Sequence, residues 1–199
     1  RIDNLHEKHL AKIRTQMGFL FQSGALFDSM TVEENILFPV MQHTKIRDRD
    51  QLKEIAKKKL ALVGLDGYQD FYPAKLSGGQ RKRVALARAI ALEPELILYD
   101  EPTTGLDPIR SDIINELIMK LQRELGITSV VVTHDMKSAT KIADRIIMLH
   151  KGRIEADGNA EAILNSPSQV VQRFIRGEIS EGDIQSMQVS FEDIKTDKK

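Results

Sequence analysis

The residues best suited to chemistry are two adjacent carboxylates that follow an apolar run. The segment LILYDE places Asp100 and Glu101 directly after a stretch that favours a buried strand. In open α/β sheets, ligands bind at the carboxyl ends of the strands. One acid there can hold Mg²⁺, usually through water, and the next can orient or deprotonate an attacking water. The plain alternative is a pair of solvated acids at a strand end.

Three further polar residues occupy similar positions. His134 ends the run VVVTH, Gln22 follows MGFLF, and Asp107 closes the tight turn TGLD. Each has a structural alternative, since a histidine at a strand end is more often structural than catalytic, and a turn before a helix is common. We expect His134 to reach the carboxylates only if its strand neighbours theirs in the sheet.

The segment LSGGQ, residues 76–80, precedes an apolar helical pattern that extends to about Leu92. A helix N-terminus carries unpaired N–H groups and a partial positive charge. With Ser-Gly-Gly at that point, a phosphate could bind to the bare backbone and to the serine hydroxyl. The alternative is that Ser77 only caps its own helix and the glycines only form a turn.

The composition argues against several classes of protein. The chain has 199 residues with 29 Lys and Arg against 29 Asp and Glu, and it has no cysteine. Zero net charge disfavours nucleic acid as a partner, so the basic run at residues 81–83 is interpreted as a solvated helix face. The absence of cysteine excludes disulfides. No apolar run approaches the roughly 20 residues that span a bilayer.

The hydrophobic pattern predicts strands that alternate with helices, and therefore a parallel α/β sheet. A T-x-x-E capping box at Thr31 and Glu34 starts the first expected helix. Expected strands are residues 17–22, 95–100, 127–133 and 145–150, and a turn is expected at Lys151 and Gly152 after the last of them. Expected helices are residues 31–41, 48–63, a helix that follows LSGG and ends at about Leu92, and residues 108–125, 136–143, 159–165 and 168–176. Residues 31–92 are interpreted as an inserted helical subdomain. The polar segment from Gly177 is interpreted as a flexible or partner-dependent tail.

Taken together, LSGGQ, LILYDEP, GLD, VTH and the strand-end Gln22 resemble the ABC-type ATPase domains in order and spacing, over about residues 15–165. The resemblance implies an α/β fold of the P-loop NTPase (RecA-like) type, with a parallel sheet core and an inserted helical subdomain, here N-terminally incomplete. Residues 1–176 would form the ATPase domain and residues 177–199 a polar C-terminal tail.

The same resemblance implies ATP and Mg²⁺ as cofactors and assigns a role to each motif residue. Asp100 would be the Walker B aspartate that holds Mg²⁺, Glu101 the catalytic base, and His134 the switch histidine on the γ-phosphate. The remaining assignments are Gln22 as the Q-loop ligand of Mg²⁺, Asp107 in the D-loop, and Leu76, Ser77, Gly78, Gly79 and Gln80 as the signature motif. In this family the signature holds the ATP of the opposite subunit, so a head-to-tail homodimer is implied.

The sequence departs from the family pattern at one motif. The Walker A loop, G-x-x-x-x-G-K-[ST], cradles the β- and γ-phosphates, and no Gly-Lys-Ser or Gly-Lys-Thr occurs in these 199 residues. The first residue, Arg1, is also not an initiator methionine. We therefore expect the chain to have been cut out of something longer and to hydrolyse ATP poorly as given.

Within the family, FQSGALFDSMTVEENILFPV is most similar to the ATPases of bacterial Mla/Mce-type lipid transporters. That likeness implies a membrane permease contacting about residues 23–41. Ala25, Leu26 and Phe27 are candidate exposed apolar contacts, and the alternative is that they pack inside the helical subdomain. The likeness also implies a location at the cytoplasmic face of the inner or plasma membrane. Three alternatives remain: an importer ATPase for another solute, a soluble family member acting on DNA or ribosomes, and a truncated, non-catalytic docking form.

Overall fold

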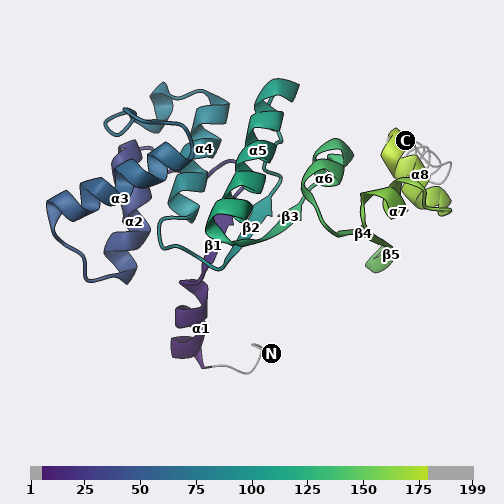
Figure 1. Ribbon diagram of the computed structural model, residues 1–199, viewed down its shortest axis with the longest axis horizontal. Coiled ribbons are helices and arrows are strands. Elements are labelled where there is room, and N and C mark those ends of the chain that lie inside the picture. The colour runs from purple at the N-terminus through teal and green to yellow at the C-terminus, as the bar shows by residue number, and fades with distance from the viewer. Residues whose placement is uncertain (1–5, 179–199) are drawn as a thin grey trace, which may run out of the picture. The chain divides into compact units, whose positions relative to one another are not determined.

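The structure is a computed structural model, and it describes residues 6–178. The chain divides into two compact units, residues 1–138 and 139–199, which are described separately (Figure 1). Helix α6, Met136–Ile142, crosses the boundary between them. No helix among the described residues is long and apolar enough to cross a membrane.

The first unit is built on a three-stranded parallel sheet in the order β1-β2-β3. The strands are Met17–Leu20, Leu96–Asp100 and Thr128–Val132. Asp100 of β2 is in register with Val132 of β3, so the carboxyl ends of these strands lie side by side. The predicted parallel sheet is confirmed for these three strands, although β1 ends two residues before Gln22.

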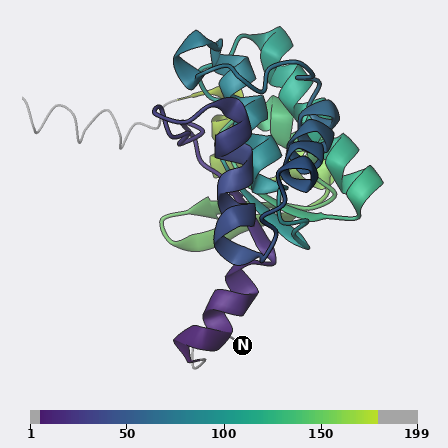
Figure 2. The same ribbon diagram turned by 90° about the vertical axis from the view of Figure 1, so that its left-hand side faces the viewer.

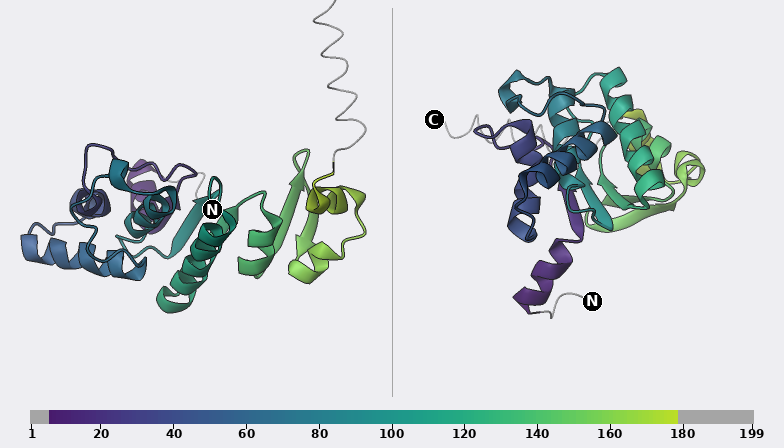
Figure 3. Two further views of the ribbon diagram at one scale, coloured as in Figure 1. Left: turned by 90° about the horizontal axis from the view of Figure 1, so that it is seen from above. Right: turned by 60° about the vertical axis from the view of Figure 1, so that its left-hand side comes forward.

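One face of this sheet is covered by helices α4, Gly78–Ala89, and α5, Pro108–Leu125 (Figure 3). The covered face buries Leu20, Ile97 and Tyr99. On the opposite face, large apolar side chains remain exposed: Phe19, Phe21, Val130 and Val132. Among the described residues, the sheet of the first unit therefore has a buried core on one face and exposed apolar side chains on the other.

Helices α2, Val32–His43, and α3, Arg49–Leu62, pack with α4 to form the helical part of the first unit. Thr31 and Glu34 make both hydrogen bonds of the predicted capping box. Helix α4 ends at Ala89, earlier than the predicted Leu92, and a short 3₁₀ turn, Pro73–Lys75, precedes it. Helix α1, Glu7–Arg14, was not predicted; it buries none of its residues and projects from the start of β1 (Figure 2).

The second unit contains an antiparallel hairpin of β4, Ile146–His150, and β5, Arg153–Gly158. Its predicted turn, Lys151 and Gly152, has φ of 47° and 75°, the left-handed values that a tight two-residue turn requires. Helices α7, Ala160–Leu164, and α8, Gln169–Arg176, follow, and Ile163 and Val171 form the buried centre. Most of the predicted tail, residues 179–199, lies outside the described residues.

Candidate functional site

The carboxyl ends of β2 and β3 bring Glu101 and His134 together. His134 Nδ1 lies 2.7 Å from Glu101 Oε1, and the His134 backbone N–H donates to the same oxygen at 3.0 Å. The other carboxylate oxygen, Oε2, accepts from Thr104 Oγ1 at 2.9 Å and from Thr133 Oγ1 at 3.3 Å. We expected His134 to reach the carboxylates only if the two strands were neighbours. The pairing of β2 with β3 confirms that they are.

These contacts shift the pKa values of both residues of the pair. Burial alone would raise the pKa of Glu101, but hydrogen bonds from His134 and Thr104 and the charge of His134 bring that pKa below its ordinary value. The same hydrogen bond and charge of Glu101 raise the pKa of His134. Glu101 is therefore held as a carboxylate whose oxygens are fixed in direction, as a group that orients or deprotonates water must be.

The backbone at Glu101 is also unusual. Its φ of 46° lies in the left-handed region, which costs a non-glycine residue roughly 1–2 kcal/mol. Such strain persists only where the surroundings fix the conformation, and it gathers at functional sites. Glu101 is thus held both at its side chain and at its main chain.

A hollow of about 450 Å³ brings Gln22 and Asp100 to one surface, together with Phe21, Ser23 and Thr104. An amide oxygen and a carboxylate fit Mg²⁺, which prefers oxygen ligands and is commonly bound by one or two protein carboxylates together with phosphate oxygens and water. Within residues 6–178, no group of three or more His, Cys, Asp or Glu side chains could by itself enclose a metal ion. The donor set therefore fits a metal shared with a phosphate ligand.

The signature residues lie at the start of α4. Ser77 is the N-cap: its Oγ accepts from the Gln80 N–H at 3.3 Å, and Gln80 Oε1 accepts from the Ser77 N–H at 2.8 Å. The structural alternative for Ser77, that it caps its own helix, therefore holds in this chain. Leu76 is buried, so its side chain anchors the loop in the core and does not face a ligand.

Gly78 and Gly79 have no evident structural reason to be glycine. A Cβ at Gly78 would come no closer than 3.7 Å to Leu106, and one at Gly79 no closer than 3.5 Å to Arg110, which are ordinary contacts. Both residues are helical, where glycine is less favourable than alanine by roughly 0.5–1 kcal/mol. Glycine here adds no side chain over the first N–H groups of α4, where Gly78 is half-buried and Gly79 is buried, so a ligand from outside the chain would approach at Gly78.

Asp107 lies near the start of α4 because the segment from Leu106 to Arg110 packs against Gly78 and Gly79. Its carboxylate caps α5 by accepting from the Arg110 N–H at 2.9 Å and pairs with Arg110 Nε at 3.2 Å. Thr104 and Thr133, which hold the Glu101 carboxylate, and the buried Lys82, which donates to the Glu101 carbonyl, are not among the residues predicted from the sequence. Thr104 could have been found as the first residue of TGLD, and Thr133 from its place directly before His134.

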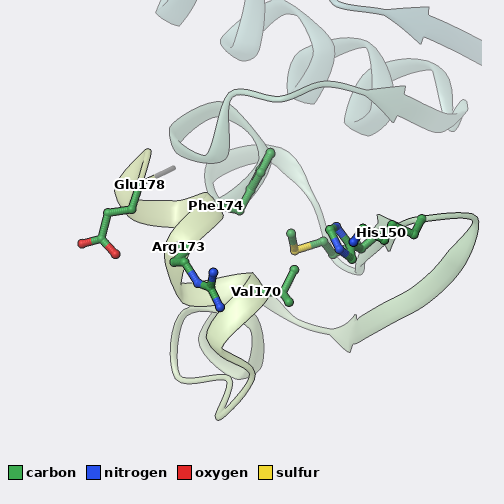
Figure 4. Close-up of a pocket in the computed structure, with 7 residues that line it drawn as sticks. His150, Val170, Arg173, Phe174 and Glu178 are labelled. Carbon is green, nitrogen blue, oxygen red and sulfur yellow. The ribbon is translucent and has the colours of Figure 1, made fainter. Parts of the chain in front are cut away.

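A second pocket, of about 330 Å³, lies within residues 139–178 and contains none of the predicted site residues. Figure 4 shows Val170 of α8 opposite His150 of β4, while the side chain of Glu178 points away from the hairpin. Of its charged residues, Lys151 and Glu178 are exposed and Arg173 is half-buried. This pocket is a groove between α8 and the hairpin, without a buried polar group to fix a ligand.

Three comparisons with known proteins agree on the family. The ABC transporter family matches residues 1–104. The intermembrane phospholipid transport system ATP-binding protein MlaF of Escherichia coli is 42% identical over 183 residues, which are 92% of this chain and 67% of MlaF. The probable ribonucleotide transport ATP-binding protein mkl of Mycobacterium tuberculosis is 42% identical over 170 residues, 85% of this chain and 47% of mkl.

The chain therefore spans about half the length of mkl and about two thirds of MlaF. Among solved structures, the ATP-binding cassette MJ0796, a dimer in a post-hydrolysis state with ADP and Pi, matches with a TM-score of 0.71 and 36% identity. That match covers 79% of this chain and 69% of MJ0796. With the parallel sheet and the clustered motif residues, these matches show that the chain belongs to the ABC transporter family of ATP-binding proteins.

Proposed function

We propose that this chain is part of an ATP-binding and hydrolysing subunit that powers an ABC transporter, with residues 1–176 in the ATPase domain and 177–199 as a polar tail. The observation that carries this proposal is the clamped Glu101. A carboxylate kept ionised at the carboxyl end of β2, with both oxygens held by His134, Thr104 and Thr133, is placed to take a proton from water.

The other residues of that edge supply the surroundings of the reaction. Gln22 and Asp100 would hold Mg²⁺ through oxygen, and Mg²⁺ would neutralise charge on the phosphates of ATP. The side chain of His134 is 70% exposed, so its ring is accessible to a γ-phosphate at this edge of the sheet. The loop that cradles the phosphates has no counterpart in these 199 residues, so we propose that the chain as given hydrolyses ATP poorly.

The bare start of α4 supports a second copy as partner. Because the chain's own packing leaves Gly78 and Gly79 room for a Cβ, the ligand that needs their N–H groups comes from outside. We propose the ATP of an opposite subunit in a head-to-tail homodimer, with Ser77, Gln80 and Asp107 at the seam. The dimeric state of the MJ0796 cassette supports this arrangement.

The loop after β1 supports a membrane permease as the other partner, contacting about residues 23–41. Asn35 holds this loop: its Oδ1 accepts from the Phe27 N–H at 2.8 Å, and its Nδ2 donates to the Phe27 carbonyl at 3.0 Å. Arg88 of α4 donates to the carbonyls of Gly24 and Ala25, each at 2.8 Å. Ala25 and Phe27 stay exposed on this fixed loop, while Leu26 is half-buried.

The transported molecule is proposed to be a phospholipid, moved by a Mla/Mce-type system at the cytoplasmic face of the membrane. The segment SGALFDSMTVEEN and the longer alignment with MlaF, 183 residues against 170 for mkl, support this choice. The alternative is an importer of another solute, since mkl carries the name of a ribonucleotide transport protein. Purification with the native permease and analysis of the bound lipid would distinguish the two.

The test of the ATPase uses Glu101→Gln in the full-length protein. We expect hydrolysis to be lost while ATP binding persists and a closed dimer accumulates, because the amide can no longer accept a proton from water. Hydrolysis at near the wild-type rate would show that Glu101 is not the base. Ser77→Arg provides the matched test of the seam: it should stop turnover but leave the variant's own nucleotide binding intact.

A further inference from the structure

Lys82 is a buried lysine that the proposed reaction does not use. It lies on α4, its relative exposure is only 6%, and its Nζ donates to the backbone carbonyl of Glu101 at 2.9 Å. Removing an ammonium group from water is costly unless its hydrogen bonds are made. We therefore expect the buried ammonium group of Lys82 to have a role that depends on its contact with Glu101.

The contact made by Lys82 lies at the strained point of the site. Glu101 has left-handed φ, its N–H donates to the Val132 carbonyl at 2.9 Å, and its own carbonyl also accepts from the Thr104 N–H at 3.3 Å. Those two bonds come from β3 and from the turn after β2. Lys82 adds a charged donor from a different element, and charge-assisted hydrogen bonds are stronger than neutral ones.

The element that bears Lys82 also bears the signature. Lys82 is three residues beyond Gly79, about 4.5 Å along the axis of one rigid helix. A shift at the start of α4 would therefore reach the carbonyl of Glu101 through a single side chain. In the proposed dimer, the start of α4 contacts the partner's nucleotide, whereas Glu101 acts on the nucleotide bound by its own subunit.

We propose that Lys82 is a positioning residue that couples the two ATP sites of the dimer, by transmitting the docking of the partner's nucleotide on Ser77–Gly79 to the main chain of Glu101. This inference rests on the proposed function. It requires that loss of the Lys82 hydrogen bond change the rate of hydrolysis and its cooperativity, and that it leave nucleotide binding largely intact.

The test compares Lys82→Met with Lys59→Met in the full-length protein. Lys59 is a matched control because it is also 6% exposed, but its Nζ pairs with the exposed Glu93 at 3.1 Å, on the helical part of the unit. Thermal unfolding, nucleotide binding, kcat, KM and the Hill coefficient for ATP are measured for both. Lys82→Arg is added because it restores a charged donor.

We expect Lys82→Met to lower kcat by about 10- to 100-fold, the range for a misplaced catalytic group. KM should change little and the Hill coefficient should fall toward 1, because the lost interaction positions a reacting group. Lys59→Met should keep wild-type kcat and cooperativity, and Lys82→Arg should recover part of both. If Lys82 were merely structural, Lys82→Met would lower the unfolding temperature without lowering kcat and the Hill coefficient at a nearly unchanged KM.

If Lys82→Met does not fold, Lys82→Ala replaces it, since alanine favours the helix and lets water reach the Glu101 carbonyl. If the wild type is active and the Lys82 variants match Lys59→Met in kcat and Hill coefficient, the proposed coupling by Lys82 is overturned while the proposed function stands. Equal losses in Lys82→Met and Lys82→Arg would also overturn it. A full-length wild type that does not hydrolyse ATP would instead overturn the proposed function.

Discussion

The Nδ1 atom of His134 lies 2.7 Å from Oε1 of Glu101, although the two residues are 33 positions apart in the chain. The parallel register of β2 and β3 creates this contact, because Asp100 and Val132 are paired and the next residues leave the sheet together. The pair joins the proposed base directly to the proposed phosphate sensor. It also makes the state of each residue depend on the other.

The first prediction concerns the pKa of His134. Its hydrogen bond and attraction to Glu101 raise the pKa above the ordinary 6.5, so Glu101→Gln should lower the pKa toward that value. Titration of the His134 ring signals by NMR measures the change. Glu124→Gln, on the exposed end of α5, is the control and should leave the pKa of His134 unchanged. A pKa that does not move in Glu101→Gln would contradict the pairing.

The same shifts fix the direction of the pH dependence of stability. The raised pKa of His134 means that its contribution is complete below pH 6.5 and is lost as pH rises through the raised pKa. The lowered pKa of Glu101 means that its contribution is complete above pH 4.5 and is lost as pH falls through the lowered pKa. The pair therefore stabilises most between pH 4.5 and 6.5, and only modestly, because His134 is largely exposed to solvent.

The second prediction separates stability from activity at the start of α4. Gly79→Ala should leave the free energy of unfolding unchanged or raise it by up to about 1 kcal/mol, because alanine favours the helix. The new Cβ meets Arg110 at an ordinary 3.5 Å. Hydrolysis by the full-length protein should nevertheless fall by about tenfold or more, because the methyl group obstructs the approach of a phosphate. Unchanged hydrolysis would contradict the proposed cross-subunit contact.

Much of this arrangement could be predicted from the sequence because its signals are local. The capping box at Thr31, the buried strand before Asp100 and the turn at Lys151–Gly152 each depend on a few adjacent residues. The contact of Glu101 with His134 followed once parallel strands were assumed. These features confirm that hydrophobic pattern and turn chemistry determine the framework of the site.

The features that sequence reasoning missed depend on distant packing. Lys82 reads as one member of a solvated basic run, yet its ammonium is buried because the helix places it against the turn after β2. The capping box of Ser77 and Gln80 is an exception, because S-x-x-Q is a local pattern of the same kind as T-x-x-E at Thr31. Helix α1 has no buried residue, so no apolar stripe marked it.

The third prediction tests what holds the loop after β1. Asn35 is fully buried, and its Nδ2 donates to the carbonyls of Phe27, Met30 and Thr31 at 3.0–3.2 Å. Asn35→Asp keeps the shape but replaces these donors with an acceptor that faces three carbonyl oxygens. We expect a loss of stability of about 2 kcal/mol or more, read from chemical denaturation. Hydrogen exchange should quicken across residues 27–31.

The control for that loop is Asp28→Asn, at an exposed position within the same segment. Asp28→Asn replaces a carboxylate with an amide, the reverse of Asn35→Asp. Any effect of exchanging these two groups that does not depend on burial should therefore appear in both variants. Equal stability of Asn35→Asp and Asp28→Asn would show that the buried hydrogen bonds do not fix the loop. Binding of the proposed permease should weaken in Asn35→Asp at temperatures where the rest of the protein remains folded.

The fourth prediction concerns the packing of β1 on α4. A Cβ at Gly18 would lie 2.5 Å from the carbonyl oxygen of Ala89 and 3.2 Å from Ile97 Cγ1, so a methyl group cannot be accommodated without backbone movement. Overpacking of this kind typically costs about 1–3 kcal/mol. We expect Gly18→Ala to lower the free energy of unfolding by that amount, measured by chemical denaturation.

Gly79→Ala is the matched control for Gly18→Ala, because both glycines are buried and neither has a left-handed backbone. The same added methyl group should therefore destabilise the protein at Gly18, where it meets backbone, and be tolerated at Gly79, where it meets a flexible arginine side chain. Since α4 also carries Lys82 and the signature, relief of the clash by movement of α4 would disturb Glu101 as well. Wild-type stability of Gly18→Ala would mean that α4 lies farther from β1. In that case α4 would not be held firmly enough to transmit a shift to Glu101.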